Sequence, residues 1–190
     1  MEENLARGNT KVTAALRKRA AKIRVLLMDA DGTLTDGSVC LLSQPDGTVT
    51  ELKVFDAHDG QGLTIAAQAG IRTGVITGRQ SPAMRQRARE NKMEFVYEGE
   101  AVKIPVYEEI LRHSGAREEE VAYIGDDLPD LPVMQRVGLA VAVANATAEV
   151  KRAAHYVTRA SGGDGAVRET VELILKAQGN WNSLISKARA

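Results

Sequence analysis

Cysteine is almost absent from the sequence, since Cys40 is the single one among 190 residues. A lone cysteine excludes an internal disulfide and agrees with a reducing cytoplasm. Net charge is lacking as well, because 25 lysine and arginine residues balance 25 aspartate and glutamate residues. No overall field favours nucleic acid or an anionic membrane, so we expect neither as a partner.

Long hydrophobic runs are also missing. No apolar stretch reaches the length of a membrane span, and residues 1–12 lack the apolar centre of a secretion signal, so we expect a cytoplasmic protein. There is no internal repeat and no linker, and the length fits a single domain over residues 1–190. The content of 44% hydrophobic and 26% charged residues is typical of a globular chain with a sizeable core.

Short apolar runs alternate with amphipathic segments along the chain. The runs predict strands at 23–29, 71–77, 94–97, 121–127, 138–143 and 155–158. The amphipathic segments predict helices at 60–70, 81–91, 101–113, from 128 onward, at 146–154 and at 165–179. This alternation predicts an α/β fold with a doubly wound, Rossmann-like parallel sheet.

Three segments stand outside this alternation. Residues 1–22 are expected to be a helical lead-in with a basic, solvated stretch. Residues 38–53 predict a β-hairpin, because two apolar runs flank the turn sequence Pro45-Asp46-Gly47. Residues 180–190 form a C-terminal tail that either reaches over a site or frays.

Acidic residues gather where two of the predicted strands end. Asp29 and Asp31 follow the first strand, in "VLLMDADGTLTDG" (25–37). Asp126 and Asp127 end the strand predicted at 121–127, and Asp130 follows it. Since ligands bind beyond the carboxyl ends of parallel strands, we expect these acids at one edge of the sheet, together with Thr77-Gly78-Arg79 from a third strand.

Such a cluster suits a hard divalent cation, and Mg²⁺ in particular is held by a few carboxylates, waters and substrate phosphate. An ionised Asp29 can attack phosphorus to form an aspartyl-phosphate. Asp31, two residues on, can donate a proton to the departing alcohol and later activate water. Thr77 and Lys103 can bind the phosphoryl oxygens that such a transfer exposes.

Four segments in this order resemble the motifs of the haloacid dehalogenase superfamily of phosphohydrolases. They are "DADGTLTDG", "ITGR", the lysine before a helix, and "GDDLPDLPVM". Further stretches, "DGQGL", "AHYVT" and "GGDGAVRETVELILKAQG", extend the resemblance over residues 22–180 to the 3-deoxy-D-manno-octulosonate 8-phosphate (KDO 8-phosphate) phosphatase family. That family implies a Mg²⁺-dependent phosphatase of an acidic sugar phosphate, active in lipopolysaccharide precursor synthesis.

The resemblance implies a role for individual residues. Asp29 is then the nucleophile, Asp31 the general acid and base, and Thr77 and Lys103 the phosphate ligands. Mg²⁺ is expected on the Asp29 side chain, the Asp31 main-chain oxygen and the Asp126 side chain, with Asp127 or Asp130 supporting it. Substrate contacts are further expected from Gly78, Arg79, His58 and Arg168.

Only 48 positions separate Asp29 from Thr77, which leaves no room for a cap domain beside the hairpin and one helix. The family resemblance implies a tetramer in which the protruding hairpins meet. The hairpin at 38–53 is therefore expected to join copies of the chain into a homotetramer. The alternative is a hairpin that folds back on its own domain.

Several residues have a structural alternative. Asp36 is favoured as a turn residue over a ligand, and Asp130 either caps a helix or supports the metal site. Arg168 binds a carboxylate or phosphate, unless its loop is flexible and Asp164 caps the last helix. Asp56 and His58 depart from the family pattern, which leaves the exact sugar acid open.

Other functions are conceivable for the same residues. A nine-carbon keto sugar acid phosphate or another small phosphometabolite is an alternative substrate. A receiver-like signalling domain also clusters aspartates, a threonine and a lysine, but Asp31 argues against it. An inactive phosphatase-like scaffold is disfavoured, because Asp29, Asp31, Lys103 and Asp126 are all present.

Overall fold

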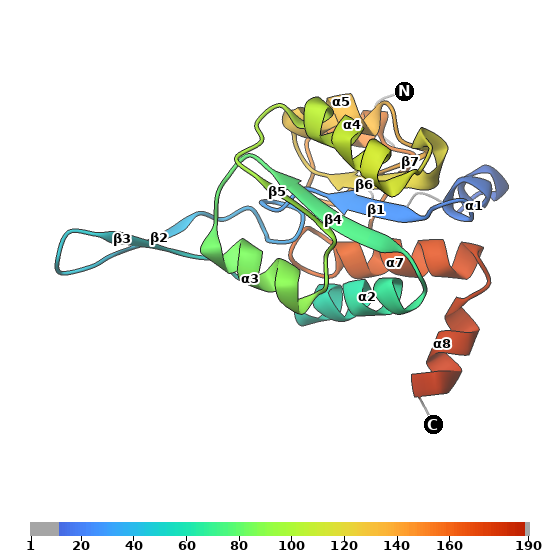
Figure 1. Ribbon diagram of the computed structural model, residues 1–190, viewed down its shortest axis with the longest axis horizontal. Coiled ribbons are helices and arrows are strands. Elements are labelled where there is room, and N and C mark those ends of the chain that lie inside the picture. The colour runs from blue at the N-terminus through green and yellow to red at the C-terminus, as the bar shows by residue number, and fades with distance from the viewer. Residues whose placement is uncertain (1–11, 189–190) are drawn as a thin grey trace.

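Six parallel strands form the central sheet of the computed structural model, which describes residues 12–188 (Figure 1). Their order across the sheet is β5-β4-β1-β6-β7-β8. The strands are β1 (Val25–Met28), β4 (Arg72–Thr77), β5 (Phe95–Glu98), β6 (Val121–Gly125), β7 (Leu139–Ala142) and β8 (Tyr156–Val157). This arrangement confirms the predicted doubly wound fold.

Helices cover both faces of the sheet. They are α1 (Ala14–Ala20), α2 (Ala57–Gln68), α3 (Pro82–Glu90), α4 (Lys103–Ser114), α5 (Leu131–Met134), α6 (Ala148–Ala153), α7 (Ala166–Ala177) and α8 (Trp181–Ala188), with 3₁₀ turns η1 (Glu118–Glu120) and η2 (Leu128–Asp130). In Figure 1, α2, α3 and α7 lie below the sheet, and α4 and α5 lie above it. Because both faces are covered, every residue of β1 is buried, which explains its unbroken apolar sequence.

The register of the central strands decides what meets at the edge of the sheet. Met28 at the end of β1 pairs with Val75 of β4 and with Ile124 of β6. The residues that follow these pairs therefore leave the sheet at the same edge. This places the loops after β1, β4 and β6 side by side, although they are far apart in the sequence.

The two ends of the described chain lie beside α7. Helix α1 buries Leu16 and Ala20 and packs against α7, so the lead-in is only partly solvated. Residues 1–11 of the predicted lead-in lie outside the described residues. The tail forms helix α8, which also contacts α7 at the end of the domain opposite the hairpin (Figure 1). In this single chain the described part of the tail is helical and packs on α7.

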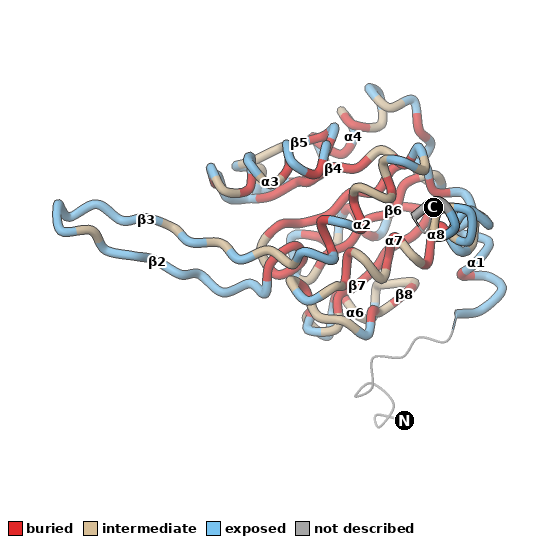
Figure 2. Tube along the Cα trace, turned by 90° about the horizontal axis from the view of Figure 1, so that it is seen from below, coloured by how far each residue is buried: buried red, intermediate tan, exposed pale blue. Residues whose placement is uncertain are grey.

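An antiparallel hairpin of β2 (Cys40–Ser43) and β3 (Val49–Leu52) leaves the domain between β1 and α2. It projects well beyond the sheet, and Figure 2 shows it exposed along nearly its whole length. The prediction of a protruding hairpin is confirmed, and the alternative that it folds on its own domain is wrong. No further domain covers the sheet edge within residues 12–188.

Candidate active site

The site lies where the direction of the chain across the sheet reverses. From β1 the chain runs through the hairpin and α2 to β4 on one side, whereas from β6 it continues to β7 on the other side. Asp29 follows β1 and Asp126 follows β6, and these two strands are neighbours. In doubly wound sheets such a reversal opens a crevice that ligands occupy.

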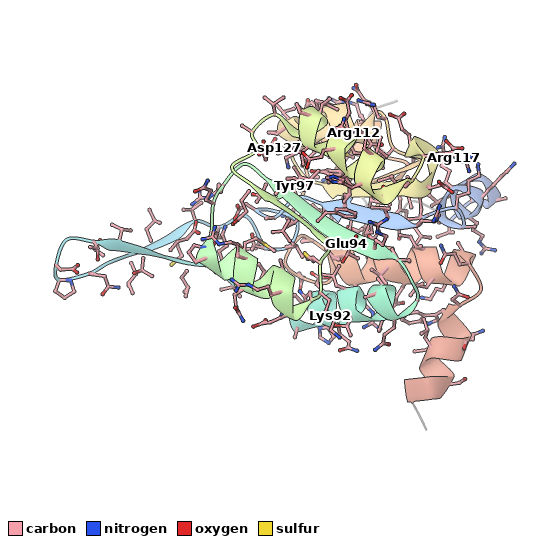
Figure 3. All side chains as sticks on the ribbon, viewed as in Figure 1. Lys92, Glu94, Tyr97, Arg112, Arg117 and Asp127 are labelled. Atoms are coloured by element: carbon pink, nitrogen blue, oxygen red, sulfur yellow. The ribbon has the colours of Figure 1, made fainter. Side chains whose placement is uncertain are left out.

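A cleft with a volume of about 250 Å³ occupies this crevice. Figure 3 places Asp127, one of its lining residues, at the end of the domain from which the hairpin projects. The cleft brings together nine residues that the sequence indicated: Asp29, Asp31, Thr77, Gly78, Arg79, Lys103, Asp126, Asp127 and Asp130. Three separate loops and the start of α4 thus converge on one cavity.

The loop after β1 is held tightly against Asp126. Gly32 has a φ of +99°, and a Cβ there would lie 2.2 Å from Asp126 Oδ2. Only glycine combines this backbone conformation with this close approach. Thr33 Oγ1 donates a hydrogen bond of 3.1 Å to Asp126 Oδ1, and Thr33 O accepts one from Gly163 N. The loop that carries Asp29 and Asp31 is therefore fixed from two sides.

Lys103 connects the acids at the floor of the cleft. Its ammonium donates to Asp29 Oδ1 at 2.5 Å, to Asp130 Oδ1 at 2.7 Å and to the hydroxyl of Tyr123 at 3.1 Å. The residue is only 5% exposed. A lysine this buried is held in place by its partners rather than solvated, as the resemblance requires of a phosphate ligand.

Asp130 has the capping role that was one of its two alternatives, and it also pairs with Lys103; its support of a metal ion stays a prediction. Its Oδ2 accepts hydrogen bonds from the backbone amides of Asp126 (2.9 Å) and Asp127 (3.2 Å), as a capping residue does. Its Oδ1 accepts from Lys103 and, at 2.8 Å, from Tyr123. Asp130 therefore both orders the loop after β6 and supports the lysine. Sequence reasoning missed Tyr123, because a tyrosine in a buried strand matches no motif.

Burial dominates the electrostatics of the acids. It raises the pKa of Asp29 to about 6, an increase that the nearby Lys103 ammonium limits. The pKa of Asp126 rises to about 7, through burial and then through the carboxylates of Asp29 and Asp130. Burial alone would lower the pKa of Lys103, but Asp29 and Asp130 outweigh it and the net direction is upward. Lys103 is one cation among three carboxylates, so the cleft favours a further cation.

Oxygen atoms of Asp29, Asp126 and Asp130 lie within 4.8 Å of one another. Carboxylate oxygens at this separation are suitable donors for Mg²⁺, which takes only a few protein ligands and keeps several waters. The raised pKa values of Asp29 and Asp126 also indicate a cation site, because a bound cation would compensate the negative charges that burial disfavours. The residues present therefore fit a magnesium ion.

A second set of polar and charged groups lies beside Asp31. Thr77 is buried at the end of β4, and its Oγ1 accepts a hydrogen bond from the Arg79 amide. The Arg79 guanidinium pairs with Glu51 of β3. Asp31 Oδ1 accepts a hydrogen bond from the ammonium of Lys53, directly after β3. Sequence reasoning missed Glu51 and Lys53; the only signal was charged residues at alternate positions of an otherwise apolar segment.

Two predicted substrate ligands lie outside the cleft of the single chain. The side chain of His58 is 83% exposed at the start of α2, with Asp56 as its neighbour at 3.6 Å. The Arg168 guanidinium pairs with Glu172 along α7 and stacks over the ring of Trp181. Neither side chain lines the cavity, and substrate contact by either of them stays a prediction.

The remaining alternatives concern turns and caps. Asp36 accepts hydrogen bonds from the amide and hydroxyl of Ser38, so it is a turn residue as expected. Asp164 does not cap the last long helix. Asp59 of α2 does so instead, because its carboxylate accepts from Gly165 N and Arg168 N at the start of α7. Burial raises the pKa of Asp59 to about 6.

A doubly wound sheet with paired aspartates after β1, a threonine after β4, a buried lysine and a further aspartate after β6 defines a phosphoryl-transfer site of the haloacid dehalogenase class. In agreement, residues 86–169 match the family model of haloacid dehalogenase-like hydrolases.

Closer relatives narrow this class. The chain is 44% identical to the KDO 8-phosphate phosphatase KdsC of Yersinia pestis, over 85% of this chain and 84% of that protein. It is 40% identical to KdsC of Escherichia coli K12, over 88% of this chain and 87% of that protein. The chain belongs to the KDO 8-phosphate phosphatase family.

A solved structure supports the same assignment. The chain superimposes with a TM-score of 0.85 on the KDO 8-phosphate phosphatase of Moraxella catarrhalis, at 37% identity over 90% of this chain and 96% of that one. That crystal structure contains a magnesium ion, a phosphate ion and a KDO molecule. None of the helices within residues 12–188 of the present chain has the length and apolar character needed to cross a membrane.

Proposed function

We propose that this chain is a Mg²⁺-dependent phosphatase that hydrolyses the phosphomonoester of KDO 8-phosphate through an aspartyl-phosphate on Asp29. The observation that carries the proposal is the convergence of Asp29, Asp31, Thr77, Lys103 and Asp126 on one cleft of the sheet edge. The names of the relatives supply the substrate class, because they act on KDO 8-phosphate. The product feeds the synthesis of lipopolysaccharide precursors.

Mg²⁺ is expected on the side chains of Asp29 and Asp126 and on the main-chain oxygen of Asp31, with Asp130 supporting them. The cation supplies charge neutralisation for the phosphoryl group and for the acids around it. Thr77, Gly78 and Lys103 contribute hydrogen-bond donors and positive charge on the protein side of the same group.

The reaction proceeds in two steps at the chain's own residues. A carboxylate oxygen of Asp29 attacks phosphorus, and the bond from phosphorus to the ester oxygen breaks while Asp31 donates its proton to the departing alcohol. Asp31 then takes a proton from water as that water attacks the phosphorus of the aspartyl-phosphate. Phosphate leaves and the Asp29 carboxylate is restored.

A phosphate-release assay tests the nucleophile. Asp29→Asn should lose activity by several orders of magnitude, because an amide cannot attack as a carboxylate does. Asp36→Asn is the matched control, since Asp36 lies on the same loop but only closes a turn with Ser38. Turnover in Asp29→Asn equal to that of the control would contradict the assignment.

A substrate panel tests the specificity. It contains KDO 8-phosphate, a phosphorylated nine-carbon keto sugar acid, hexose phosphates and phosphoglycolate, and we expect the highest kcat/KM for the eight-carbon acid. A preference for the nine-carbon acid or for phosphoglycolate would overturn the assignment of KDO 8-phosphate as the substrate and leave the proposed mechanism unchanged. Asp56 caps α2 through its bond to the Asp59 amide, so its departure from the family pattern has a structural use and is no reason to change the substrate.

We further propose that the hairpin joins copies of this chain into a cytoplasmic homotetramer. The supporting observation is an exposed apolar surface on the hairpin, with Leu41 60%, Leu42 59% and Leu52 57% exposed. Apolar side chains grouped on a projecting element mark a contact with another protein. A second copy is the occupant we favour, because the copies carry the same apolar hairpin and a closed symmetric assembly buries all of them at once.

Light scattering after gel filtration tests the assembly. Leu42→Glu combined with Leu52→Glu should lower the mass from four chains to one, because the glutamates would be buried without partners. Val12→Glu is the control, since it places the same charge on a partly exposed valine far from the hairpin in the sequence. A mass that is unchanged in the double variant would contradict this role of the hairpin.

A further inference from the structure

The base of the hairpin carries four charged groups that we call the charge cluster: Asp31, Glu51, Lys53 and Arg79. Lys53 donates a hydrogen bond to Asp31 Oδ1, and its ammonium is 3.8 Å from Glu51. Glu51 pairs with Arg79, whose Nε lies 3.9 Å from Asp31 Oδ2. Two cations thus alternate with two anions, and the proposed acid and base of the reaction is one of the four.

Lys53 is the unusual member of the charge cluster. Its side chain is only 3% exposed, whereas the guanidinium side chain of Arg79 is 45% exposed. A buried ammonium has few positions in which its charge is compensated, so Lys53 is confined to the neighbourhood of Asp31 and Glu51. It reaches this position because the hairpin strand β3 ends directly before it.

The two oxygens of Asp31 differ in their surroundings. Oδ1 is held by Lys53. Oδ2 is buried but has no hydrogen-bond partner among the described residues. Asp31 itself lines the cleft. A buried carboxylate oxygen without a hydrogen bond is costly in a folded protein, and it is retained where a ligand completes its hydrogen bonding.

We propose that Lys53 is a positioning residue that anchors Asp31 through Oδ1 and so presents Oδ2 to the leaving-group oxygen and, later, to the attacking water. This inference rests on the proposed role of Asp31 as acid and base. Without the anchor, rotation of the Asp31 side chain would populate orientations that do not transfer a proton to the substrate. Misplacement by about 1 Å is enough to reduce turnover by about 100-fold in well-oriented sites. The hairpin then completes the catalytic machinery as well as offering an assembly surface.

The test compares two substrates in Lys53→Met, which removes the ammonium and keeps the length of the chain. For the sugar acid phosphate, kcat should fall by about 10- to 100-fold with KM changed less than about threefold. With p-nitrophenyl phosphate, the leaving group departs without a proton, so the pre-steady-state burst of p-nitrophenolate should slow by less than about threefold. Lys53→Arg should recover most of the activity, because it restores a cation to Asp31.

Two further variants make the result interpretable. Asp31→Asn is the reference, and it should show the same contrast between the two substrates in stronger form. Lys176→Met is the matched control, because it removes an ion-paired lysine on α7, remote from the cleft. Thermal melting confirms that each variant is folded.

The possible outcomes separate the explanations. If Asp31→Asn shows no contrast between the substrates, the proposed mechanism fails. If Asp31→Asn shows the contrast between the substrates and Lys53→Met behaves as the wild type, only the positioning role of Lys53 fails. A raised KM with unchanged kcat would make Lys53 a substrate ligand, and equal losses on both substrates, or no recovery in Lys53→Arg, would make it a structural residue. Each of these results overturns the inference.

Discussion

Magnesium binding should weaken steeply as the pH falls below neutrality. Asp126 has a pKa of about 7 and Asp29 a pKa of about 6 in the metal-free protein. Only the ionised carboxylates bind the cation, so protons compete with it at both residues. Above about pH 8 both groups are ionised and the affinity for Mg²⁺ should be nearly constant.

The size of the effect follows from these two values. If a proton competes with Mg²⁺ independently at each of the two carboxylates, these pKa values make the dissociation constant for Mg²⁺ about 20-fold larger at pH 6 than at pH 8. At pH 5.5 the dissociation constant is about 100-fold larger than at pH 8. One proton should be released on binding near pH 6.5, and two should be released at pH 5. The dependence is steeper than a single carboxylate could produce.

Isothermal titration calorimetry in buffers of different ionisation enthalpy measures both the affinity and the protons released. Asp126→Asn should remove one proton from the count, besides weakening the binding. Asp59→Asn is the control, because Asp59 has a pKa of about 6 but caps α7 outside the cleft. An affinity that varied less than threefold between pH 6 and pH 8 would refute the reasoning from buried, metal-linked acids.

Three other variants test the packing and charge of the site. Without Mg²⁺ at pH 8, the unfolding free energy of Asp126→Asn should exceed that of the wild type by about 1–3 kcal/mol after screening, because the variant removes a buried like charge. The gain should shrink as the pH falls below 7 and vanish only below about pH 4, where the carboxyl of the unfolded wild type is protonated as well. Lys103→Met should abolish phosphate release and lower the unfolding free energy by about 3–5 kcal/mol, because Asp29 and Asp130 lose their common cation. Gly162→Ala should lower the unfolding free energy by about 1–3 kcal/mol and kcat by at least tenfold, because the new Cβ would lie 1.7 Å from Gly32 O and displace the loop that carries Asp29 and Asp31. An unchanged melting temperature and unchanged kinetics would show that this loop tolerates the added methyl group.

Much of the site could be predicted because parallel sheets obey a topological rule. Asp29, Thr77 and Asp126 each end or follow a strand, and alternating strands and helices bring such positions to one edge whatever lies between them. Lys103 was found through the family motif, because nothing in its local sequence distinguishes it from a solvated lysine. Its burial and its three partners are properties of the folded chain.

Other features could not be predicted. Lys53 is 22 positions from Asp31, and it meets that residue only because the hairpin returns to the mouth of the cleft. Asp59 replaces Asp164 as the cap of α7 because α2 packs against that helix. The contact of the Arg168 guanidinium with the ring of Trp181 joins α7 to α8, and no local pattern indicates it.

The sequence by itself determined the order of strands and helices, the projecting hairpin and the acids that gather at the sheet edge. These follow from short-range rules, because apolar periodicity and turn residues act over a few positions and strand ends converge by topology. Only the tertiary structure decided how the charges pair: Lys103 with Asp29 and Asp130, and Lys53 with Asp31. Pairing depends on contacts between distant segments and on the burial that makes an unpaired charge costly, and neither is written in local sequence.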